Sequence, residues 1–161
     1  MIRFPTVARS RQQPHGLRKD GPRFLKIAHR GYSERYPENT ILAFEKAIRS
    51  GTDMIELDVR LSKDGRIVVI HDDRIDRTSD GSGKVADMTL AELKRYSFNN
   101  GMTQYGFIGI PTLEETLDLV GERVALNIEI KERPDRQGAI EERLCALLRE
   151  LGAVDRVIVS S

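Results

Sequence analysis

The fold is decided by a run of alternating apolar and acidic residues, Met54-Ile55-Glu56-Leu57-Asp58-Val59-Arg60. Alternation with a period of two is typical of a β-strand, in which successive side chains point to opposite faces. Ile55, Leu57 and Val59 therefore share one face and are expected to pack beneath helices. Glu56 and Asp58 share the other face, where buried carboxylates need a cation or basic side chains to offset their charge.

A strand and a helix precede this segment. Residues 24–28 are a short, mostly apolar stretch that leads to His29, and they are predicted to form the preceding strand. An amphipathic helix is predicted between Asn39, expected to be its N-cap, and Gly51, which suits the position after its end. Strand, helix and strand in this order are typical of a parallel α/β sheet.

The segment after the deciding strand departs from this alternation. The Asp64-Gly65 pair lies between two strand-like runs, which indicates a β-hairpin. The returning strand, residues 67–70, is expected to bring His71 back to the level of Asp58. We interpret residues 61–111 as this hairpin followed by a small insertion.

Regular alternation of helices and strands resumes at Thr112. A capping box at Thr112 predicts the start of a helix, and one at Thr89 predicts a short helix within the insertion. A strand is predicted over residues 124–131, a helix over residues 140–151 and a fourth barrel-type strand over residues 157–159.

The strand over residues 124–131 adds further charged groups to the candidate site. Glu129 and Lys131 share one of its faces by the same alternation. Functional groups of parallel α/β folds gather at the carboxyl ends of strands, which would bring these two residues near Glu56 and Asp58. Oxygen ligands of this kind suit Mg²⁺ or Ca²⁺, so the pattern favours a metal site that faces a phosphate. A structural cluster of ion pairs is the alternative.

Two histidines stand where strands are expected to end. A histidine titrates near neutrality, so His29 and His71 suit a reaction in which one group removes a proton and another delivers one. Cleavage of a phosphodiester needs both steps. Arg30 is adjacent to the first histidine and suits bidentate binding of phosphate oxygens. Either histidine alone would more commonly be a capping or core residue.

Together these residues form an ordered series of motifs that resembles the glycerophosphodiester phosphodiesterase family. Many separate motifs in one order make the resemblance specific. It extends from about residue 27 to the last residue and rests on His29-Arg30-Gly31, Pro37-Glu38-Asn39-Thr40, Glu56-Leu57-Asp58-Val59, Lys63-Asp64-Gly65, Val69-Ile70-His71-Asp72, Met88-Thr89-Leu90, Pro111-Thr112-Leu113-Glu114-Glu115 and Glu129-Ile130-Lys131.

The resemblance implies an α/β fold of the (β/α)₈ TIM-barrel type with a small insertion after the second strand. A full barrel needs about 250 residues, so this chain of 161 residues holds only the first four strands. The implied reaction is hydrolysis of glycerophosphodiesters to glycerol 3-phosphate and an alcohol. The implied roles are His29 and His71 as acid/base pair, Glu56, Asp58 and Glu129 as ligands of Mg²⁺ or Ca²⁺, Arg30 and Lys131 as phosphate-binding groups, and Glu38 as a supporting residue beside the site.

Two alternatives follow from the same residues. The first is a related lipid phosphodiesterase of the sphingomyelinase D or phosphatidylinositol phospholipase C type. The second is an inactive, truncated remnant that acts as a binding module. A half-barrel leaves its fourth strand open, so we also expect self-association or a partner that covers this edge.

The overall composition restricts the other classes of function. The chain is 39% hydrophobic and 32% charged with a net charge of +1, which suits one globular domain and gives no reason to expect a nucleic-acid partner. No apolar run is long enough for a transmembrane segment. Residues 1–23 are predicted to form a basic, flexible arm without a secretory signal. The single cysteine, Cys145, is predicted to lie in the core and suits a reducing compartment, so we expect a cytoplasmic location.

Overall fold

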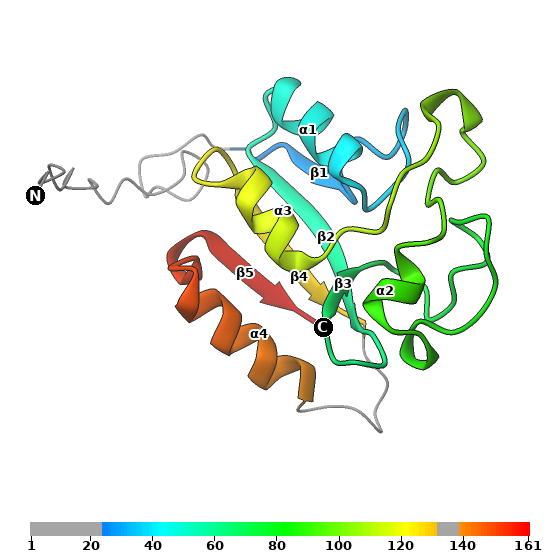
Figure 1. The fold of residues 1–161 in the computed structure, drawn as a ribbon. Helices are drawn as coiled ribbons and strands as arrows, with labels where there is room; N and C mark the ends of the chain where they lie inside the picture. Colours follow the sequence, from blue (N-terminus) through cyan, green and yellow to red (C-terminus); the bar gives the residue numbers. More distant parts are fainter. Residues whose placement is uncertain (1–23, 132–138) are drawn as a thin grey trace, which may run out of the picture.

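Five strands form a single sheet in the part of the chain that the computed structural model describes, residues 24–131 and 139–161 (Figure 1). Their bounds are β1 Ile27–His29, β2 Met54–Leu61, β3 Ile67–Val69, β4 Ala125–Ile130 and β5 Val157–Ser160. The order is β1-β2-β4-β5 with parallel neighbours, and β3 pairs antiparallel with β2. The predicted arm, residues 1–23, lies outside the described residues.

Three helices pack against one face of this sheet. They are α1 Ile41–Arg49, α3 Leu113–Val120 and α4 Ala139–Glu150. Their apolar stripes meet the apolar residues of β2 and β4 in one core cluster, whose members include Phe44, Leu57, Leu117, Leu126 and Leu144. Full burial of such a side chain contributes about 1.5–3 kcal/mol. Packing on this face therefore fixes the sheet, and the acidic residues of the strands are left to the opposite face.

The starts of the helices are set by side-chain caps. The capping boxes predicted at Thr89 and Thr112 are confirmed, and they begin the short helix α2 (Leu90–Leu93) and α3. The prediction of Asn39 as the cap of α1 is wrong, because the cap is Thr40, whose hydroxyl accepts from the backbone N–H of Ala43 at 3.2 Å. Asn39 instead has a positive φ of 54°, which turns its side chain toward the sheet.

The predicted hairpin and insertion are present. β3 pairs with β2 in the register Val59↔Val69, and the N–H of Ile70 donates to the carbonyl of Asp58 at 2.9 Å. His71 therefore lies beside β2, as the sequence predicted. The insertion packs a second apolar cluster against the returning strand of the hairpin; its members are Val68, Ile70, Ile75, Val85, Leu93, Phe98 and Ile110. In Figure 1 this segment, in green, lies beyond the carboxyl ends of the parallel strands.

The outer edges of the described sheet are exposed. Ile27 on β1 is 54% exposed, and Ile158 and Val159 on β5 are 45% and 48% exposed. In the described residues β5 has only β4 as a neighbouring strand. None of the helices in the described ranges is long and apolar enough to cross a membrane.

The prediction that Cys145 lies in the core is wrong, because this cysteine is exposed. The buried stripe of α4 consists of Ile140, Leu144 and Leu148, at a spacing of four residues. Cys145 is one residue beyond that stripe, so the helix turns it away from the sheet.

Candidate active site

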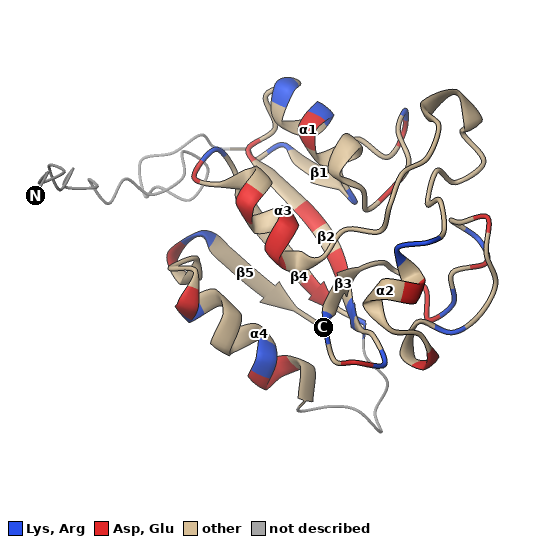
Figure 2. Cartoon of the chain, in the orientation of Figure 1, with Lys and Arg blue, Asp and Glu red and all other residues tan. Residues whose placement is uncertain are grey.

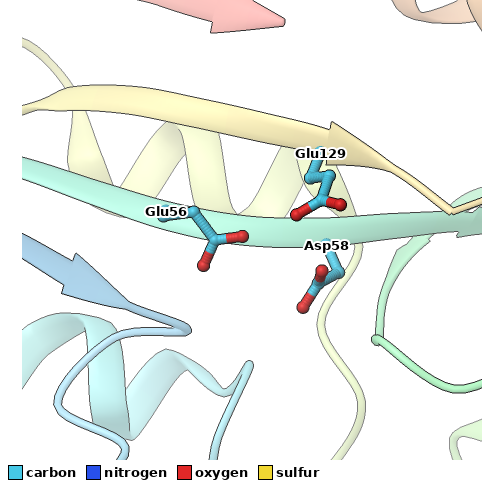
Figure 3. Close-up of side chains that lie close together, drawn as sticks. All are labelled: Glu56, Asp58 and Glu129. Carbon is cyan, nitrogen blue, oxygen red and sulfur yellow. The ribbon is translucent and has the colours of Figure 1, made fainter. Parts of the chain in front are cut away.

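The strand register brings three carboxylates together. Asp58 of β2 and Glu129 of β4 are direct partners in the parallel ladder, and Glu56 lies two residues earlier on the same face. Figure 3 shows the three side chains on one side of the sheet. One oxygen from each of the three lies within 4.8 Å of the others. The predicted convergence of these acids is therefore present.

Burial makes this cluster costly unless a cation offsets it. Glu56 is 7% exposed and Asp58 is 1% exposed. Among the described residues, Oε1 of Glu56 and Oδ1 of Asp58 are buried without a hydrogen-bond donor. Burial raises the pKa of Glu56, and the negative charges of Asp58 and Glu129 add to this effect, which outweighs the hydrogen bond from the N–H of Arg30. Unpaired carboxylate oxygens in this arrangement fit a hard divalent cation.

Two basic side chains offset part of the negative charge. Nζ of Lys131 bonds to Oε1 of Glu129 and lies 3.7 Å from Oδ1 of Asp58. Nε of Arg30 lies 3.3 Å from Oδ2 of Asp58 and forms an ion pair with it. In the described part of the chain this N–H has no hydrogen-bond acceptor in suitable geometry. Nη1 of Arg30 donates to Oε1 of Glu38 at 2.9 Å. Both predicted phosphate-binding residues thus lie beside the acids, and Glu38 supports one of them.

The two histidines approach the cluster from the end of β1 and from the end of the hairpin. Nε2 of His29, at the end of β1, is 3.8 Å from Oε2 of Glu56. His71 follows Ile70, whose N–H donates to the carbonyl of Asp58. The hydrogen bond from Lys131 is the main cause that lowers the pKa of Glu129, and a positive charge on His71 adds to this effect. All eight site residues predicted from the sequence therefore lie on or around the acidic face of the sheet. In Figure 2 the acidic segments of β2 and β4 are neighbours on the sheet.

Comparison with known proteins identifies the group to which this arrangement belongs. Residues 29–160 match the glycerophosphoryl diester phosphodiesterase family. The chain belongs to this family. It is 47% identical over 138 residues to a glycerophosphodiester phosphodiesterase of Bacillus altitudinis, which corresponds to 84% of this chain and 56% of that protein. It is 48% identical over 142 residues to one of Caldanaerobacter subterraneus subsp. tengcongensis, 85% of this chain and 57% of that protein.

Solved phosphodiesterase structures share the fold. An enzyme of this name from Agrobacterium tumefaciens superposes with a TM-score of 0.75 at 34% identity, over 84% of this chain and 57% of that one. A phosphodiesterase of Oleispira antarctica, solved with sn-glycerol-3-phosphate as product, gives a TM-score of 0.73 at 35% identity, over 77% of this chain and 51% of that one. The α/β TIM-barrel class is thus confirmed, and this phosphodiesterase-family chain spans about half the length of the curated relatives it matches.

The sequence did not reveal three residues that the structure adds to the site of this phosphodiesterase-family chain. Nδ2 of Asn39 donates to Oδ2 of Asp58 at 2.9 Å, and the positive φ that Asn tolerates better than most residues makes this contact available. Oδ1 of Asp72 lies 2.7 Å from Nδ1 of His71. Arg77, in the insertion, bonds to Asp72 and to Glu38. Asn39 and Asp72 belong to motifs that support the family resemblance, but no sequence pattern indicated their contacts, and Arg77 lies in none of these motifs.

We predict that Glu56→Gln stabilises the metal-free chain at neutral pH. The pKa of Glu56 is raised in the folded state, so its ionised form costs stability above that pKa, and the cost disappears below the unfolded-state value of 4.5. With a chelator present, the urea midpoint of the variant should exceed that of the parent chain at about pH 7. The difference should vanish as the pH falls to about 4, because the carboxyl group is then protonated in both states.

The matched control is Glu45→Gln on α1, where the carboxylate reaches solvent and pairs with Arg49. A surface change of this kind should alter stability by no more than about 0.5 kcal/mol. A lower midpoint for Glu56→Gln than for the parent chain at about pH 7 would contradict the prediction. It would mean that the neighbouring basic groups already satisfy the Glu56 carboxylate without a metal ion.

Proposed function

We propose that this chain carries the catalytic half of an enzyme that hydrolyses glycerophosphodiesters to glycerol 3-phosphate and an alcohol. The observation that carries the proposal is the cluster of three carboxylates within 4.8 Å of one another, flanked by two histidines and two basic side chains. Support also comes from the relatives, which are named glycerophosphodiester phosphodiesterases. The Oleispira antarctica structure contains sn-glycerol-3-phosphate as product.

The proposal assigns a divalent cation, Mg²⁺ or Ca²⁺, to the acidic cluster. Glu56, Asp58 and Glu129 would hold it through carboxylate oxygens, which both ions prefer. The unpaired buried oxygens of Glu56 and Asp58 support this assignment. When bound, such an ion neutralises charge on the phosphate and lowers the pKa of an attacking hydroxyl.

The histidines are proposed to move the protons of the reaction. As the attacking oxygen bonds to phosphorus, one histidine takes its proton, and the bond from phosphorus to the leaving oxygen breaks as the other histidine protonates it. Nδ1 of His71 is directed at Asp72, so Nε2 is the atom of His71 left for this transfer. Arg30 and Lys131 are proposed to hold the phosphate oxygens, and the hydrogen bond from Arg30 to Glu38 and the position of Lys131 beside Asp58 support these roles.

Two further expectations stay predictions. The cytoplasmic location rests on cysteine usage alone. A partner or a second copy that covers the exposed edges rests on the apolar residues at Ile27, Ile158 and Val159. The alternative of a non-catalytic binding module is decided by the activity measurements below, because such a module would bind the cation without turnover.

We predict that His29→Ala and His71→Ala each lower the rate of hydrolysis by about 10²–10⁴-fold, the contribution expected of one acid or base. Release of glycerol 3-phosphate from glycerophosphocholine and glycerophosphoethanolamine would be measured for the chain and for a chimera. The chimera extends the chain with the C-terminal half of the Bacillus altitudinis relative, which supplies the length that this chain does not span.

The control is His15→Ala, because His15 is the remaining histidine of the sequence and has no proposed role. Folding of each variant would be checked by circular dichroism. Near-normal turnover of either site variant would contradict the acid/base roles. If neither the chain nor a folded chimera releases glycerol 3-phosphate, the proposed hydrolysis is contradicted.

We also predict that a chelator abolishes hydrolysis and that Mg²⁺ or Ca²⁺ restores it. In Asp58→Asn the added cation should no longer restore hydrolysis, because the substitution removes one negative charge from the carboxylate cluster. Asp118→Asn, on the exposed side of α3, is the matched control and should be restored like the parent chain. Full activity in the presence of the chelator would be incompatible with a functional ion at the three carboxylates.

A further inference from the structure

Arg77 of the insertion bridges two carboxylates that belong to different loops. Nε and Nη2 of Arg77 donate to Oδ2 and Oδ1 of Asp72 at 2.7 and 3.1 Å. Nη1 and Nη2 donate to Oε2 and Oε1 of Glu38 at 2.9 and 2.8 Å. Both contacts use the planar guanidinium as a fork, which fixes the orientation of a carboxylate as well as its position.

Each of these carboxylates holds a residue of the candidate active site. Oδ1 of Asp72 lies 2.7 Å from Nδ1 of His71, and Oε1 of Glu38 accepts from Nη1 of Arg30 at 2.9 Å. An ionised carboxylate can only accept hydrogen bonds, so the hydrogen between Asp72 and His71 belongs to Nδ1 of the histidine. The neutral imidazole is then held as one tautomer, with Nε2 bare.

The carboxylates of Asp72 and Glu38 stay ionised near neutral pH. The hydrogen bond from Arg77 is the main cause that lowers the pKa of Asp72 to about 2. Burial acts to raise the pKa of Glu38, but hydrogen bonds from Arg77 and Arg30 outweigh it and keep this pKa below its usual value. Both carboxylates therefore remain ionised hydrogen-bond acceptors near neutral pH.

We propose that Arg77 is a positioning residue: through Asp72 it fixes the tautomer and ring orientation of His71, and through Glu38 it fixes the guanidinium of Arg30. A single side chain of the insertion thereby aligns the acid/base group on one loop with the phosphate-binding group on another. The consequence for the reaction rests on the proposed hydrolysis. The effect on the tautomer of His71 does not depend on it.

The tautomer can be measured directly on the chain labelled with ¹⁵N-histidine, because the two ring nitrogens of a neutral imidazole have distinct chemical shifts when protonated and bare. In the parent chain the Nδ1–H form of His71 should dominate. In Arg77→Met the carboxylate of Asp72 is free to rotate, and the ratio of Nδ1–H to Nε2–H should fall about fivefold, as expected for the loss of one modest hydrogen bond. Asp72→Asn should lower the same ratio.

The matched control is Arg74→Met in the same insertion. The side chain of Arg74 is 46% exposed against 45% for Arg77, and it bonds to Asp76 instead of Asp72. Its variant should keep the parent ratio at His71. A folded Arg77→Met with an unchanged ratio would overturn the inference, because Arg77 would then serve only to attach the insertion.

A second substitution covers the case in which Arg77→Met does not fold. Arg77→Lys keeps the charge, but one ammonium group cannot form two forks, so the ratio should again fall; the parent ratio in this variant would overturn the inference. In protein that releases glycerol 3-phosphate, Arg77→Met should also lower kcat more than tenfold, as a misplaced acid or base does, and Arg74→Met should not. If the parent protein shows no hydrolysis, the proposed function fails, and the tautomer ratio still decides the role of Arg77.

Discussion

The site depends on the parallel pairing of β2 with β4, which sets Asp58 opposite Glu129 on the face of the sheet that the helices do not cover. The same pairing places Glu56 two residues away, so three carboxylates share one small volume. Arg30 and Lys131 offset part of this charge, but buried oxygens of Glu56 and Asp58 stay without a donor among the described residues. This cost in the metal-free chain supports the proposal that a divalent cation binds there.

The sequence was sufficient for much of this arrangement because period-two patterns determine which face each strand residue occupies. The acids, the Asp64-Gly65 hairpin and the capping boxes at Thr89 and Thr112 all follow from local rules, and all are confirmed. The sequence failed where a loop path decides the contact. Arg77 meets Asp72 and Glu38 only because the insertion folds over the carboxyl ends of the strands, and no local pattern encodes that path.

Two predictions are wrong for another reason, because they rest on the preference of a residue type alone. Asparagine favours helix caps, but the neighbouring Thr40 caps α1, and the amide of Asn39 donates to Asp58 instead. Cysteine is commonly a core residue, whereas the helical period puts Cys145 beside the buried stripe of α4, where it is exposed. The comparisons with known proteins identify the family and the barrel class. The chain spans about half the length of its relatives, so catalysis by this chain is a proposal, which the carboxylate cluster supports.

The most direct test of the account is a crystal structure of this chain grown with Mn²⁺, whose anomalous scattering locates the ion independently of the protein atoms. Mn²⁺ prefers the same oxygen ligands as Mg²⁺ and Ca²⁺. The account predicts one strong anomalous peak within about 2.0–2.6 Å of one oxygen from each of Glu56, Asp58 and Glu129. A well-ordered structure in which Mn²⁺ binds elsewhere, with these carboxylates held only by Arg30 and Lys131, would contradict it.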